Sequence, residues 1–127
     1  MLRRAAITPR KRARAGRPAW KVANDFRRWL RTLPCAACHR PAVEMALNES
    51  AHVDHAGDKG VGTKVSDRFC IPLCPECHAC QHSEGWLTFE KKLDQGSAVA
   101  LSGLYWTDWP GRREWERDLA ARGEALA

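Results

Sequence analysis

The sequence lacks any long apolar run. No stretch of its 127 residues approaches the roughly 20 consecutive apolar residues that a membrane-spanning helix needs. No apolar segment follows the basic N-terminus, so we expect neither a membrane span nor a secretory signal, and we expect a cytoplasmic location. The length fits one domain plus tails. Its hydrophobic core is modest, so we expect an additional stabilising cross-link.

Acidic residues are nearly absent from the first 34 positions, which hold eleven Lys and Arg but only Asp25 as an acid. The net charge of +6 is therefore the sum of a strongly basic N-terminal arm and a body with a net charge of −4. Such an arm predicts a polyanionic partner, DNA, although a solvated tail without a specific partner is the alternative. The candidate DNA contacts are Arg10, Lys11, Arg12, Arg14, Arg17, Arg27, Arg28, Arg31 and Lys64. The oligomeric state stays open.

Composition divides the chain into three segments. Residues 1–18 are rich in Arg and hold almost no large apolar residues, which predicts a disordered basic arm. Residues 19–95 are expected to form a helix and a metal-bearing core, and residues 96–127 a helical C-terminal cap with a charged helix from about Arg112. The tryptophans are expected to pack around the metal core (Trp29 and Trp86) and to attach the cap (Trp106, Trp109 and Trp115).

Apolar periodicity predicts the elements of the core. Helical spacing over residues 19–33 indicates an amphipathic helix ended by Pro34, and the apolar positions are Trp20, Ala23, Phe26, Leu30 and Leu33. Residues 42–54 are ambiguous but can form a strand with one apolar face, made of Met45, Leu47, Ala51 and Val53, and with Glu44 and His52 on the other side. A glycine-rich loop at 57–64 precedes a short strand at 69–73, in which Pro72 is expected only at an edge or a strand end. Helices are expected from Pro75 to Gly85 and over 86–93.

Six cysteines without an export signal favour metal binding over disulfides. Four of them form two C-x-x-C pairs, Cys35 with Cys38 and Cys74 with Cys77. Four thiolates in two such knuckles suit a closed, tetrahedral structural Zn²⁺, and reduced, buried cysteines are the alternative. Cys70 is interpreted as a core residue, and Cys80 could compete as a ligand.

Histidines supply two further signals. His78 and His82 are four residues apart, so on a helix both imidazoles lie on one face and can bind one ion. His52 just precedes the glycine-rich loop, and a neutral imidazole can act as a general base near pH 7. Either signal alone also fits ordinary surface histidines.

In combination, these residues resemble the HNH (ββα-metal, or His-Me finger) endonuclease superfamily, especially compact phage-associated members with a zinc-stapled core. The resemblance rests on residues 29–38 (WLRTLPCAAC), 51–53 (AHV), 60–68 (GVGTKVSDR) and 71–82 (IPLCPECHACQH). It implies an α+β fold with a ββα-metal core and a structural zinc, flanked by helices. It also implies His52 as the general base, with His78 and His82 holding a catalytic Mg²⁺, Mn²⁺ or Zn²⁺. The implied reaction hydrolyses a DNA phosphodiester to a 5′-phosphate and a 3′-hydroxyl.

The sequence departs from the family pattern at two places. No Asn lies between His52 and His78, so we expect Asp67 or a backbone carbonyl to orient the His52 ring. Ala51 stands where many members carry a metal ligand before the base. A second register makes Asp54 the ligand and His55 the base; we favour His52 because its flanking residues match better.

Three functions follow as hypotheses. The first is a metal-dependent DNA endonuclease. The second is a non-catalytic, zinc-stapled DNA-binding or adaptor protein, which the two departures favour. The third is a zinc-ribbon module for protein–protein contacts, which would have no affinity for DNA at physiological salt.

Overall fold

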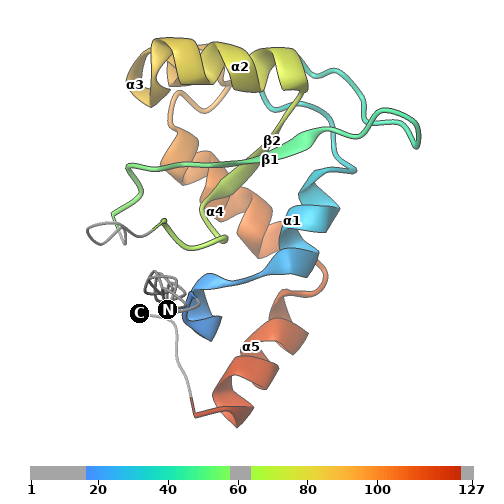
Figure 1. The fold of residues 1–127 in the computed structure, drawn as a ribbon, viewed down its shortest axis with the longest axis vertical. Coiled ribbons are helices and arrows are strands. Elements are labelled where there is room, and N and C mark those ends of the chain that lie inside the picture. The colour runs from blue at the N-terminus through green and yellow to red at the C-terminus, as the bar shows by residue number, and fades with distance from the viewer. Residues whose placement is uncertain (1–16, 58–63, 124–127) are drawn as a thin grey trace, which may run out of the picture.

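A hairpin of two short antiparallel strands lies between helices in the computed structural model, which describes residues 17–57 and 64–123 (Figure 1). Strand β1 (Glu49–His52) pairs with β2 (Cys70–Leu73), so that Glu49 lies opposite Leu73 and His52 opposite Cys70. Helix α2 follows β2 directly, and Figure 1 shows α2 on one side of the hairpin with α1 and α4 on the other. The expected α+β class is confirmed. The elements are η1 (Ala19–Lys21), α1 (Asn24–Leu30), β1, β2, α2 (Pro75–Glu84), α3 (Trp86–Phe89), η2 (Glu90–Lys92), α4 (Ala98–Asp108) and α5 (Arg112–Ala121).

The prediction of one continuous helix over residues 19–33 is wrong. The chain forms the short 3₁₀ helix η1 and then α1, with a break at Ala23, whose backbone is not helical (φ −140°, ψ 71°). The Ala23 amide donates to the Asp67 carboxylate at 2.8 Å instead of to a helical carbonyl. A contact 44 residues away in sequence therefore divides the helix. The apolar face is nevertheless correct at Phe26 and Leu30, which are fully buried.

The strand prediction over residues 42–54 holds only for its second half. Val43 and Ala46 form an isolated bridge that closes a tight turn, and the regular strand begins at Glu49. Met45 is 96% exposed and Leu47 is also exposed, so neither lies on the buried face. Ala51 and Val53, by contrast, are fully buried.

The second half of the chain follows the predicted boundaries closely. Helix α2 begins at Pro75, with the side chain of Cys74 as its N-cap, and ends at Glu84. Gly85 is the C-cap, and its φ of 82° suits glycine. The helix expected over 86–93 occurs as α3 and η2. Helix α5 begins at Arg112 as expected. Pro72 lies in a two-stranded sheet, where every strand is an edge strand.

Two hydrophobic clusters hold these elements together. The first surrounds the cysteines and includes Trp86, Phe89 and Ile71. The second joins α1 to α4 through Phe26, Trp106 and Trp109, with the Phe26 and Trp106 rings 5.0 Å apart and edge to face. Trp29 packs against this second cluster, so its predicted place beside the cysteines is wrong, whereas that of Trp86 is confirmed. Cys70 is a buried core residue, as predicted.

No helix in the described ranges is long and apolar enough to cross a membrane.

Candidate metal centre and histidine-lined cleft

Four cysteines from distant parts of the chain meet beside the hairpin. The Sγ atoms of Cys35, Cys38, Cys74 and Cys77 all lie within 4.8 Å of one another. Four thiols this close together are the donor set that a tetrahedral Zn²⁺ takes. The cluster can therefore hold a structural metal ion such as zinc. Cys80 lies outside it: its thiol contacts Glu84 and Lys92, each at 3.2 Å.

Local backbone geometry presents each pair of thiols. The first pair lies on a tight turn, in which the His39 amide donates to the Cys35 carbonyl at 2.9 Å. His39 completes the turn with φ 64°, a left-handed conformation that a non-glycine residue rarely adopts. The second pair lies at the start of α2, where the Cys77 amide donates to the Cys74 Sγ at 3.4 Å. The Ala36 amide bonds the Pro72 carbonyl at 2.8 Å, which brings the two pairs together.

One thiol of the cluster ionises readily without an ion nearby. Burial opposes ionisation of Cys35, but backbone amides, including those of Cys38 and Cys74, outweigh burial and lower its pKa to about 7. Amide donors stabilise a thiolate in the same way as they stabilise other anions. A thiolate is the form that binds a metal, so this turn is suited to receive a cation.

A cleft of about 310 Å³ lies next to the hairpin and is separate from the cysteines. It is lined by Arg27, Ser50, His52, Asp54, Lys64, His78, Gln81 and His82. The fold thus brings the three histidines singled out in the sequence into one cavity. Ser50 and His52 reach the cleft from one face of β1, because alternate residues of a strand point the same way.

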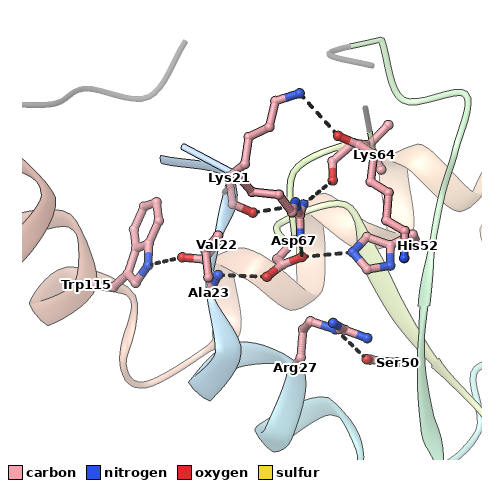
Figure 2. A network of polar contacts seen from close by, with 11 residues as sticks. Lys21, Val22, Ala23, Arg27, Ser50, His52, Lys64, Asp67 and Trp115 are labelled. Atoms are coloured by element: carbon pink, nitrogen blue, oxygen red, sulfur yellow. Dashed lines mark hydrogen bonds and ion pairs between the residues drawn. The ribbon is translucent and has the colours of Figure 1, made fainter. Parts of the chain in front are cut away.

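His52 is fixed by a carboxylate. Its Nε2 lies 2.8 Å from Oδ1 of Asp67, whose side chain is 1% exposed, and Figure 2 shows this pair within a wider polar network. Burial raises the pKa of Asp67, but hydrogen bonds from His52, the Ala23 amide and Arg17 outweigh it and lower that pKa to about 2. Asp67 is therefore ionised and must accept the proton of Nε2–H. Nδ1 remains as the unprotonated nitrogen of a neutral His52.

His78 and His82 lie on one face of α2, with their ring centroids 4.8 Å apart. Nδ1 of His78 contacts Oε1 of Glu49 at 2.9 Å. A carboxylate on one ring nitrogen fixes the orientation of an imidazole and leaves the other nitrogen for a metal. Within the described ranges, the four cysteines are the only group of three or more metal-ligating side chains whose ligand atoms lie this close together. His78 and His82 are not part of such a group.

The alternative register places its residues differently. Asp54 lines the cleft, but His55 does not: it lines a neighbouring hollow with Trp86 and Leu87. The His55 Nε2 lies 3.8 Å from a Glu90 oxygen.

The predicted DNA contacts fall into four groups. Arg27 and Lys64 line the cleft. Arg28 is paired with Asp25 at 2.9 Å, and Arg17 donates to Asp67 at 2.8 Å and to the Val65 carbonyl at 2.7 Å. Arg31 is exposed. The remaining candidates, Arg10, Lys11, Arg12 and Arg14, lie outside the described residues, as does most of the proposed disordered arm.

Sequence reasoning missed three residues of this site, Glu49, Ser50 and Gln81. Ser50 could have been found from strand periodicity, since it lies two residues before His52. Glu49 carries no such signal, because its contact with His78 spans 29 residues. Only the packing of α2 against β1 brings that pair together.

The fold and the site define an α+β protein with a four-cysteine centre able to bind a metal and a separate histidine-lined cleft. The chain belongs to the family described as "Protein of unknown function (DUF968)", which it matches over residues 11–103. It is 37% identical over 80 residues to the "Uncharacterized protein YdfU" of Escherichia coli (strain K12), a match that covers 63% of this chain. The chain spans only 21% of that relative's length. No solved structure matches the chain.

Proposed function

We propose that this protein is a metal-dependent DNA endonuclease of the ββα-metal type, with a structural zinc on the four cysteines. The observation that carries the proposal is the cleft in which His52, oriented by Asp67, faces the same space as His78 and His82. The order β1, β2, α2 agrees with the strand–strand–helix order of that class. The basic arm predicted from the sequence supports DNA as the substrate.

His52 would act as the general base. Its Nδ1 would take a proton from water while the water oxygen bonds to the phosphorus and the bond from phosphorus to the 3′-oxygen breaks. The departing 3′-oxygen would take a proton from solvent, which gives a 5′-phosphate and a 3′-hydroxyl. Asp67 holds Nε2 and stabilises the imidazolium that forms, in the way a buried carboxylate does in other histidine-dependent hydrolases.

His78 and His82 would hold the catalytic divalent ion, with Asp54 at the same cleft as a possible further ligand. Imidazole suits several transition metals, and the Glu49 carboxylate fits the role of an orienting partner for His78. When bound, such an ion neutralises charge on the scissile phosphate.

A plasmid-cleavage assay with a base-deletion variant tests the proposal. Purified protein is mixed with supercoiled plasmid and Mg²⁺ or Mn²⁺, and His52→Ala and His55→Ala are assayed beside it. We expect nicking or linearisation by the wild type, and a rate about 10²- to 10⁴-fold lower for His52→Ala with unchanged zinc content. His55→Ala is expected to cut normally, because His55 lies outside the cleft.

Two results would contradict the assignment. Normal cutting by His52→Ala would show that His52 is not the general base. Loss of cutting in His55→Ala would assign that role to His55, as in the second register. Absence of cleavage by the wild type with either metal would reject the nuclease.

One observation favours a second function, a non-catalytic DNA-binding or adaptor protein. In the residues that the structure describes, His78 and His82 do not form a compact group of three potential ligands as the four cysteines do. Under this alternative, plasmid stays intact while gel shifts show binding with a steep dependence on salt.

A further inference from the structure

Arg27 occupies a special position among the arginines of α1. The apolar stripe of the helix, with Phe26 and Leu30, is buried in the second hydrophobic cluster. Arg27 follows Phe26 and is turned toward β1, where its Nε donates to the Ser50 Oγ at 2.9 Å (Figure 2). Ser50 is itself only 7% exposed. A buried hydroxyl from the strand thus fixes a guanidinium from the helix.

The guanidinium is also part of the wall of the cleft. Arg27 lines the same cavity as His52 and His78, so it lies where the proposed substrate would enter. In the part of the chain that the structure describes, the contact with Ser50 uses only the Nε–H of the guanidinium. The two terminal amino groups form the part of the fork that binds two oxygens of one anion.

We propose that Arg27 is the phosphodiester clamp of this cleft, held in orientation by Ser50. The inference rests on the proposed function and adds to it a residue for substrate positioning. A planar fork suits the two non-bridging oxygens of a phosphodiester, and an ammonium group in its place would supply charge without that geometry. Lys64 lines the same cleft and adds positive potential, which outweighs the single carboxylate of Asp54 there.

The adjacent arginine provides a matched control, because the structure places this predicted DNA contact away from the cleft. Arg28 is the next residue of α1, has the same charge and is paired with Asp25 at 2.9 Å. Its side chain is 74% exposed and lines a different hollow, between the start of α1 and α5. A comparison of the two positions separates a clamp in the cleft from general attraction of DNA to basic residues.

The test measures binding first and cleavage second. Binding of a short fluorescent duplex is followed by anisotropy without added Mg²⁺ or Mn²⁺ at 0.15 M salt for Arg27→Ala, Arg27→Lys, Ser50→Ala and Arg28→Ala. We expect Arg27→Ala to weaken binding about tenfold or more, the scale of a lost charged hydrogen-bond pair, and Arg28→Ala to change it by less than about threefold. Arg27→Lys is expected to recover only part of the affinity, and Ser50→Ala to lose a smaller part with Arg27 still present.

Cleavage by the same variants distinguishes the proposed clamp from the proposed nuclease activity on which it rests. If the wild type cuts, kcat of Arg27→Ala should fall about 10²-fold or more, with the circular dichroism spectrum and zinc content unchanged. Equal effects of Arg27→Ala and Arg28→Ala on binding, or full activity of Arg27→Lys, would overturn the clamp while leaving the nuclease intact. If the wild type binds but does not cut, the nuclease fails, and a tenfold loss confined to Arg27 still supports the clamp.

Discussion

Asp67 links three separate parts of the chain through one carboxylate. Its Oδ1 accepts from Arg17 and from His52, each at 2.8 Å, and its Oδ2 accepts from the Ala23 amide. A buried carboxylate with this many donors favours the ionised form, which is why its pKa falls to about 2. Asp67 therefore fixes the His52 ring and the break between η1 and α1 at the same time.

Removal of that charge should destabilise the fold at every pH near neutrality. For Asp67→Asn we expect the free energy of unfolding to fall by about 2 kcal/mol, from the difference between the folded and unfolded pKa. A lowered pKa stabilises the fold fully above the unfolded value near 4, and the effect is lost as the pH falls from about 4 to about 2. Urea unfolding of both proteins should thus give a constant difference from pH 8 to pH 5.

Asp25→Asn is the control, because Asp25 is exposed and its ion pair among the described residues is with Arg28. This variant should unfold at nearly the wild-type urea concentration. A difference for Asp67→Asn that disappears between pH 8 and pH 5 would show that Asp67 is not held ionised.

At the level of the element, helix α2 carries residues of both the cysteine cluster and the histidine-lined cleft. Cys77 faces the thiol cluster, whereas His78 and His82 face the cleft. A metal on the cysteines would therefore fix the N-terminus of the helix that positions both histidines. Such a site contributes directly to the free energy of folding, because the unfolded chain does not preform it.

Two cysteines on α2 allow a matched test of the zinc. We expect purified wild type to contain one Zn²⁺ per chain by mass spectrometry of the metal. Cys77→Ser should lose the metal and most of its helical circular dichroism, whereas Cys80→Ser should keep both, since the Cys80 thiol lies outside the cluster. A folded, zinc-free Cys77→Ser protein would show that zinc on the four cysteines is not needed for folding.

At the level of the whole molecule, the described part of the fold includes the last two residues of the predicted arm. The sequence assigns Arg17 and Pro18 to the arm, but Arg17 is bonded to Asp67 and the Pro18 carbonyl accepts from the Lys21 amide at 2.9 Å. The arm is therefore attached next to the residue that orients His52.

Two truncations separate DNA binding from stability. Removal of residues 1–16 should weaken binding to duplex DNA and reduce the slope of log affinity against log salt, because fewer counterions are released, while the melting temperature stays unchanged. Removal of residues 1–18 should also lower the melting temperature, because it takes Arg17 from Asp67. An unchanged salt slope after the shorter truncation would show that the arm does not contact phosphate.

The sequence by itself determined the features that depend on local spacing. The two C-x-x-C pairs, the start of α2 at Pro75 and the shared face of His78 and His82 each follow from short-range geometry. The α+β class and the buried faces of α1 and β1 follow from periodicity for the same reason. Met45 and Leu47 show the limit, since alternation predicted a strand where a turn exposes both.

Only the tertiary structure decided which distant groups meet. Asp67 breaks the first helix at Ala23 and orients His52, and Glu49 contacts His78, because these contacts span between 15 and 44 residues. The choice of His52 over His55 for the cleft likewise depends on how β1 packs against α2. Local sequence favours a conformation for each segment, whereas burial of charge and the closure of long loops depend on the whole chain, and these decide the geometry of the site.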